Sequence, residues 1–583
     1  MLNSRWRWIL LRLVPIFIFA VVGIRLFKVQ VVDHDYYKAM ASETRVKSYE
    51  LLAKRGEVFM MDGDEVVPAI INERTWTIFV DPSYVADRDK VQARLTEILG
   101  DNMIVSWDEV WADLSLQYIE VAKGVNYDTV SKIKAENLRG VGRKETSRRV
   151  YPNGQLASQV LGFVNAEGSG SGIEGSQNER LKGKDGMLKT VTDVNDIPLS
   201  IGDENIEIPA QNGDNLVLTI DAKVQRKVEK ILREAIESSE GAIENGSAVV
   251  MNPNTGRFYA IANYPTYNPE EYWNVDDASV FTNRATESLY EPASICKTFT
   301  YAAAINEGVL NPDDTFYNSG HTQVEDRIIN NAQGTAAVDG LTISFRTALD
   351  YSLNTGSVEA LRRLGGGSIT EDARWKLYNY LYDGFGLGQK TGLELYEEEG
   401  LLISPDDPSG EGNAVRYANM TFGQGMNLTM VQVAAGFSAL VNGGDYYQPT
   451  LLAGEYKNGR LDEYEQKGAV RKVVSPETSA TLRDMMREVH AQSKGTDDKA
   501  GYAIGTKTGT AETYDENGNY TSDRTNVGVI GFGGEDVEGA LPQYVILIRL
   551  DGNTLLWGGL NGLPVFSKIS NYMLEYLRLE PNI

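Results

Sequence analysis

The chain is 583 residues long, 42% of them hydrophobic, and its formal net charge at pH 7 is −25. A single hydrophobic core rarely grows beyond about 250–300 residues, so this length indicates a globular protein with at least two domains. The acidic balance argues against binding to nucleic acid or anionic lipid, and the single cysteine excludes an intrachain disulfide.

The chain opens with an apolar segment that has basic residues at its start. Residues 9–24 are apolar except for Arg12, and Trp6 and Trp8 lie at one edge. A membrane-spanning helix needs about 20 mostly apolar residues, and flanking basic residues favour the cytoplasmic side. We expect residues 1–28 to form a cytoplasmic tail and a single-pass anchor in the cell membrane, with the rest of the chain outside the cytoplasm. A cleaved signal peptide is the alternative, although no clear Ala-x-Ala site follows.

Two larger regions follow the anchor. We expect residues 29–213 to form an elongated pedestal domain and residues 214–583 to form a second, mixed α/β domain. The pattern of the second region predicts a β-hairpin of residues 247–251 and 258–262 with a turn at 254–256, a strand at 544–548 and a helix at 565–577. The expected fold class is therefore α+β and multidomain.

A serine and a lysine in the second region are spaced for catalysis. Ser294 lies three residues before Lys297, in a segment predicted to be helical with Pro292 near its start and Gly308 near its end. Residues i and i+3 share a helix face, so the two side chains can meet. A serine needs a base to become a nucleophile, and a lysine can serve when burial and a nearby positive charge lower its pKa. We therefore expect Lys297 to be neutral at rest.

Two further motifs follow Ser294 and Lys297 along the chain. They are Ser352-Leu353-Asn354 and Lys507-Thr508-Gly509, the latter followed by Thr510. Each motif alone recurs by chance in long chains, but the ordered set with Ser-x-x-Lys is typical of β-lactamases and penicillin-binding proteins. None of the three histidines lies near a Gly-x-Ser-x-Gly turn, which argues against a Ser-His-Asp triad. The set predicts an acyl-transferring serine enzyme whose base is a lysine.

The chain resembles the class B, monofunctional penicillin-binding proteins over nearly its whole length. The segments that carry the resemblance are residues 55–58, 148–152, 172–174, 181–183, 216–221, 290–294 and 422–425 with Thr429, besides the three motifs. The resemblance implies an N-terminal anchor, a pedestal (dimerisation-like) domain and a C-terminal penicillin-binding domain of the β-lactamase-like serine acyltransferase kind. It implies no cofactor and no metal.

The resemblance also implies a role for each motif residue. Ser294 would attack a D-alanine carbonyl of a peptidoglycan stem peptide, Lys297 would be its base, Ser352 would relay a proton and Asn354 would hold the substrate backbone. Lys507, Thr508, Gly509 and Thr510 would bind the terminal carboxylate of the substrate, and backbone N–H groups of Ser294 and Thr510 would form the oxyanion hole. β-Lactams would acylate the same serine. A polytopic glycosyltransferase of the SEDS family is the implied membrane partner.

The chain departs from the family at three places. Ala293 stands where a glycine usually precedes the nucleophile, Cys296 stands at a position that is often aromatic, and residues 60–63 replace a common Asp-Arg-Asn-Gly. Cys296 is expected to be a small packing residue on the nucleophile's helix.

The sequence leaves several hypotheses about the biological function. Residues 316–329 and 527–532 favour the division branch over elongation. A β-lactamase is a second enzyme hypothesis, which the long N-terminal region disfavours. A third is a scaffold that mainly activates a SEDS glycosyltransferase and has a weak active site.

Overall fold

The computed structural model describes residues 4–37, 46–165, 168–191, 206–332, 334–493, 496–514 and 520–582. Its contacts divide the chain into two compact units. One combines Met1–Gly56 with Glu179–Asp214, and the other combines Glu57–Asn178 with Asn215–Ile583. The chain thus passes from one unit to the other more than once, and the last of these crossings, after Asp214, lies beside the expected boundary at residue 213.

The smaller unit contains the apolar N-terminal helix. Helix α1 spans Ser4–Phe27 and continues as a π-helical turn over Lys28–Val32. Its apolar part, Leu13–Val32, is 20 residues long, which fits the thickness of a bilayer core, and none of its apolar window is buried. The helix therefore extends beyond the predicted end of the anchor at residue 28. The same unit holds a three-stranded sheet in the order β1-β6-β7, formed by Val46–Leu51, Gly186–Val191 and Ile206–Ile208.

A seven-stranded sheet in the larger unit combines strands from both sides of residue 213. Its order is β17-β16-β8-β2-β3-β4, with β5 paired to β3. The strands are β2 (Val58–Asp62), β3 (Glu65–Val80), β4 (Ile119–Val125), β5 (Val141–Val150), β8 (Leu216–Asp221), β16 (Leu452–Lys457) and β17 (Arg460–Glu463). Because β2 pairs in parallel with β8, strands from before and after residue 213 share one sheet. Helices α3 (Arg88–Leu99) and α5 (Tyr127–Ala135) complete a local core with β3 and β4.

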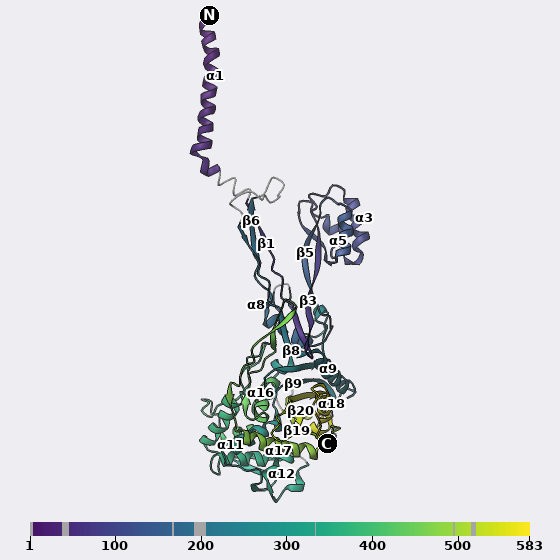
Figure 1. Ribbon diagram of the computed structural model, residues 1–583, viewed down its shortest axis with the longest axis vertical. Coiled ribbons are helices and arrows are strands. Elements are labelled where there is room, and N and C mark those ends of the chain that lie inside the picture. The colour runs from purple at the N-terminus through teal and green to yellow at the C-terminus, as the bar shows by residue number, and fades with distance from the viewer. Residues whose placement is uncertain are drawn as a thin grey trace. The chain divides into compact units, whose positions relative to one another are not determined.

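The Lys507 motif belongs to a second sheet of the larger unit, which is antiparallel and five-stranded; its strands β9, β19 and β20 are labelled in Figure 1. Its order is β10-β9-β21-β20-β19, with bounds Phe258–Tyr264, Ile243–Met251, Tyr544–Gly552, Tyr520–Glu535 and Tyr502–Tyr514. The predicted hairpin is confirmed as β9 and β10, and the predicted strand at 544–548 as part of β21. Strand β19, which carries Lys507, is one of the two edge strands of this sheet.

Helices cover both faces of this sheet. Ala248 and Val250 of β9 share a buried cluster with helices α9 (Ala222–Glu237) and α18 (Leu563–Tyr576), and α18 confirms the predicted helix at 565–577. Successive strand residues point to opposite faces. Met251 accordingly contacts Ser438 of helix α16 (Met430–Val441), so α16 lies on the other face.

The helix that follows Ser294 is a central core element. A 3₁₀ turn over Ala293–Ile295 leads into helix α11, Cys296–Asn306, as the sequence predicted. Nine consecutive residues from Cys296 to Ala304 are buried, and a helix that is buried on every side is fixed by its surroundings. Ser294 therefore stands at the start of a rigid element.

An ion pair joins two of the N-terminal segments that resemble the family. Arg149 of β5 donates through Nε to Glu174 Oε1 at 2.9 Å, and its Nη2 contacts the same oxygen. The Glu174 side chain is fully buried, and Arg149 is 13% exposed. Helix α7, Gly172–Ser176, is thereby tied to β5.

We expect Glu174→Gln to destabilise the larger unit by about 3–5 kcal/mol, because breaking one partner of a buried pair leaves the other charge uncompensated. Thermal unfolding of the purified chain measures this. The matched control is Glu145→Gln, whose partner Arg74 lies in an exposed pair and which should cost less than about 1 kcal/mol. Equal effects of the two changes would contradict the prediction.

Candidate active site

The structure joins Ser294 and Lys297 directly. Lys297 Nζ lies 2.9 Å from Ser294 Oγ, one helical turn away on the same face of the segment. Lys297 is 1% exposed, whereas Ser294 is half-buried and reachable from solvent. A base within hydrogen-bond reach of an accessible hydroxyl is the arrangement that nucleophilic catalysis requires.

Ser352 connects this pair to the second lysine. Its Oγ accepts hydrogen bonds from Lys297 Nζ at 3.2 Å and from Lys507 Nζ at 2.9 Å. Lys297 Nζ also donates to the backbone carbonyl of Ser352. Ser352 has a left-handed backbone, φ +54°, between helices α12 (Phe345–Asp350) and α13 (Asn354–Leu364). That turn aims both its hydroxyl and its carbonyl at the lysines.

Burial governs the charge of both lysines. Desolvation and, secondarily, the positive charge of Lys507 hold the pKa of Lys297 well below its ordinary value of 10.5. Burial lowers the pKa of Lys507 to about 8, although the negative charge of Asp350 partly opposes this. Lys297 is therefore the neutral amine and Lys507 the more readily protonated partner, as the sequence predicted for Lys297.

Strand β19 passes directly beside the turn of the nucleophile. A Cβ on Gly509 would lie 2.6 Å from the carbonyl oxygen of Pro292, so only a glycine permits this approach. Thr508 is half-buried and Thr510 is exposed, both close along the chain to Lys507. The motif thus forms one wall of the site.

Asn354 faces another element. It is the first residue of α13, and its Nδ2 donates to the backbone carbonyl of Asn330 at 2.9 Å. Asn330 ends β13 (Arg327–Asn330), which pairs with β12 (His321–Val324) in a hairpin. Asn354 therefore ties this hairpin to the segment that carries Ser352.

The remaining candidate nucleophile and base lie away from the reacting side. Cys296 is fully buried, and burial raises the pKa of its thiol, which makes it an inert packing residue. His490 contacts Thr506 Oγ1 through Nδ1 at 3.0 Å. Thr506 and Lys507 point to opposite faces of β19, so His490 lies behind the strand.

Sequence reasoning missed Asp350 and Gly423. Asp350 lies two residues before Ser352, and its negative charge raises the pKa of Lys507. No sequence spacing predicts this interaction between distant segments. Gly423 lies against Ala293, whose N–H donates to the Gly423 carbonyl at 3.3 Å. The quoted segment 422–425 contained Gly423, but only the fold shows that it supports the turn of the nucleophile.

Comparisons with known proteins agree with this geometry. Residues 246–571 match the family described as the penicillin binding protein transpeptidase domain, and residues 50–218 match the penicillin-binding protein dimerisation domain. The chain belongs to the penicillin-binding proteins, and the pair of domains is the class B arrangement that the sequence predicted.

Similar proteins cover nearly the whole chain. Stage V sporulation protein D of Bacillus subtilis is 30% identical over 99% of this chain and 86% of its own length. Peptidoglycan D,D-transpeptidase FtsI of Escherichia coli is 24% identical over 99% of this chain and 93% of its own length. Among solved structures, penicillin binding protein 2X of Streptococcus thermophilus superimposes with a TM-score of 0.68 at 25% identity, covering 91% of this chain and 80% of that one.

The contact between Gly423 and Ala293 generates a prediction. A Cβ on Gly423 would lie 2.2 Å from the carbonyl oxygen of Ala293, so Gly423→Ala must displace the turn before Ser294. We expect acylation by penicillin to slow by at least about tenfold, since small misplacements of a nucleophile are costly. Stopped-flow or quenched-flow acylation rates measure this.

The matched change is Ala293→Gly. Ala293 has φ +51°, a left-handed conformation that costs a non-glycine residue about 1 kcal/mol. Glycine relieves this strain, so we expect unchanged or slightly raised stability and acylation within about threefold of the original rate. Wild-type acylation by Gly423→Ala would refute this account of the turn.

Proposed function

We propose that this chain is a membrane-anchored peptidoglycan D,D-transpeptidase. The observation that carries the proposal is the hydrogen-bonded series Ser294–Lys297–Ser352–Lys507 inside a domain of the penicillin-binding family. The relative in Escherichia coli is named for this activity. The proposed substrates are stem peptides of peptidoglycan, and β-lactams are the proposed inhibitors.

The first half-reaction uses the neutral amine of Lys297. Ser294 Oγ attacks the carbonyl of the penultimate D-alanine while Lys297 Nζ takes the hydroxyl proton. The peptide bond then breaks, and the proton passes to the departing nitrogen of the terminal D-alanine, with Ser352 as a relay between the lysines. The product is an acyl ester on Ser294, and an amine of a neighbouring stem peptide resolves it.

The second lysine and strand β19 position the donor. Lys507, Thr508 and Thr510 bind the terminal carboxylate in this proposal, with Gly509 allowing the close approach. Backbone N–H groups of Ser294 and Thr510 stabilise the developing oxyanion. Asn354 uses its amide nitrogen on Asn330, which leaves its amide oxygen to accept from a substrate N–H.

For the cellular setting we propose septal wall synthesis. Residues 1–28 would form the cytoplasmic tail and the beginning of an inner-membrane anchor, 29–213 the pedestal domain, and 214–583 the transpeptidase domain outside the cytoplasm. The partner would be a SEDS-type glycosyltransferase. Depletion should give filaments with unfinished septa, whereas rounded cells would indicate the elongation branch. A sporulation defect alone would indicate the process named in the Bacillus subtilis relative.

Intact-mass spectrometry tests the acyl-serine. The purified chain should gain one penicillin mass that persists for hours, and Ser294→Ala should gain none, because no other nucleophile of the described site is both exposed and activated. Rapid loss of the adduct with turnover would instead support a β-lactamase. Normal growth of cells whose only copy of this protein is the Ser294→Ala variant would favour the scaffold hypothesis.

The two lysine pKa values set a pH profile. Lys297 is the active amine above its lowered pKa, so the second-order acylation constant should reach its plateau well below pH 10.5. Lys507 is cationic below its pKa of about 8, so binding of a carboxylate-bearing substrate should weaken as the pH rises through that value. Lys507→Arg, which stays charged, should move the alkaline limb upward. A rate that climbs up to about pH 10 would contradict the assignment of Lys297.

A further inference from the structure

A polar cavity of about 520 Å³ lies next to the segments that flank the nucleophile. Its lining comes from the tip of the β12–β13 hairpin, from the region of helix α15 (Ala414–Met420) and from Gln424 and Gly425. Gly423 contacts Ala293, and Gly425 donates to Glu291 Oε1 at 2.8 Å. Because Gly425 is two residues from Gly423, this wall begins within about 8 Å of the glycine that contacts the turn of Ser294.

The opposite wall is also tied to the catalytic motifs. The hairpin begins its return strand at Arg327 and ends it at Asn330, where Asn354 binds its carbonyl. Four strand residues span about 13 Å, so the hairpin runs from the Ser352 segment out to the cavity. Below it, Val324 and Ile329 pack with Val358, Ala418 and Phe422 in one buried cluster. Both walls are therefore anchored by packing.

The cavity carries more negative than positive charge. Three carboxylates, Glu325, Asp326 and Glu411, face two guanidinium groups, Arg327 and Arg416. Arg416 pairs with Glu411 and donates through Nη1 to the Gly425 carbonyl at 2.9 Å, so it holds the loop in place. Glu325 and Asp326 form the exposed tip of the hairpin, and Asp326 has only a long, solvent-exposed contact of 3.9 Å with Arg327.

The second half-reaction needs an amine at the acyl ester, and amines of stem peptides reach the enzyme as ammonium ions. The wall formed by Lys507 is cationic near neutral pH and repels an ammonium ion. We propose that the cavity binds the acceptor stem peptide, and that Glu325 and Asp326 attract its ammonium group to the nucleophile's turn. This inference rests on the proposed transpeptidase function and names the place of its second substrate.

The resolving step then balances as follows. The bound ammonium loses one proton to solvent, and the amine attacks the acyl carbon. The bond to Ser294 Oγ breaks, and a second proton of the amine passes through Lys297 Nζ to Oγ, which restores the hydroxyl. The carboxylates at the hairpin tip act only on binding and orientation, so they influence aminolysis of the acyl-enzyme by cationic acceptors.

The test compares two nucleophiles on the same acyl-enzyme. The chain is acylated by a D-alanyl thioester donor and offered D-alaninamide, a cationic amine, or hydroxylamine, which is uncharged at neutral pH. Mass spectrometry gives the ratio of each aminolysis product to the hydrolysis product. For Glu325→Gln/Asp326→Asn we expect the D-alaninamide ratio to fall by at least about threefold, with the hydroxylamine ratio changing far less.

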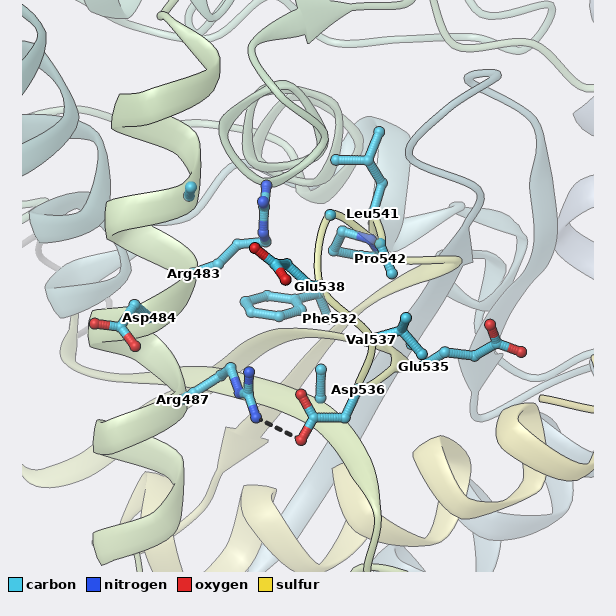
Figure 2. A pocket seen from close by; sticks show the side chains of 15 residues that line it. Arg483, Asp484, Arg487, Phe532, Glu535, Asp536, Val537, Glu538, Leu541 and Pro542 are labelled. Carbon is cyan, nitrogen blue, oxygen red and sulfur yellow. Dashed lines mark hydrogen bonds and ion pairs between the residues drawn. The ribbon is translucent and has the colours of Figure 1, made fainter. Parts of the chain in front are cut away.

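The matched control removes two exposed carboxylates from other cavities, as Glu465→Gln/Glu538→Gln. Glu538 lines the cavity between helix α17 (Pro476–Gln492) and the loop after β20, where Arg487 pairs with Asp536 (Figure 2). This control should leave both ratios unchanged. Without any variant, added salt should lower the D-alaninamide ratio of the wild-type chain more than the hydroxylamine ratio.

The inference is overturned if the hairpin variant acylates normally and keeps its D-alaninamide ratio. It is also overturned if the D-alaninamide and hydroxylamine ratios fall equally, since only a cationic nucleophile should respond to the lost charges. An equal loss in the control pair overturns it as well, because the effect is then one of net charge. If the wild-type chain itself fails to acylate, that result contradicts the proposed transpeptidase function, on which this inference rests.

Discussion

The chemistry of this protein depends on removing two lysine side chains from water at one serine. Lys297 and Lys507 are both 1% exposed, and both donate to Ser352 Oγ. Neither can keep an ordinary pKa in that environment, because desolvation disfavours the ammonium form of both, and the positive charge of Lys507 further lowers the pKa of Lys297. Asp350 breaks the symmetry, since its charge favours protonation of Lys507. The two lysines therefore differ in pKa, which supports the proposed roles of Lys297 as the base and Lys507 as the cationic binding group.

The second constraint is the close approach of backbone segments around the turn of Ser294. Gly509 of β19 and Gly423 lie so close to residues 292–293 that a side chain on either would overlap backbone atoms. The turn is thereby held between strand β19 and the loop at Gln424 and Gly425, which lines the polar cavity. A nucleophile held from two sides keeps its distance to Lys297 while substrates exchange, which is what effective positioning requires.

Local relations in this chain were predictable, and long-range relations were not. Ser294 and Lys297 meet because an i,i+3 spacing places them on one helical face, so two residues and a helix pattern suffice. The hairpin of β9 and β10 likewise follows from alternation and a short turn. The motifs indicated Ser352 and Lys507, but only the family resemblance gave them a role. Asp350, Gly423 and the Asn354–Asn330 contact arise from packing between segments that no periodicity connects.

The pairing of distant strands shows the same limit. The sequence places a boundary at residue 213, and the chain leaves the smaller unit for the last time after Asp214, but β2 and β8 pair in parallel across that point. Strand pairing over more than 150 residues leaves no mark in either strand alone, since both read as short apolar runs. Strand β8 begins immediately after this boundary. It is followed along the chain by α9 and then by β9 of the five-stranded sheet. The N-terminal region is therefore continuous in its hydrogen bonding with the domain that carries Ser294, so a displacement of β2 reaches the catalytic domain through backbone bonds.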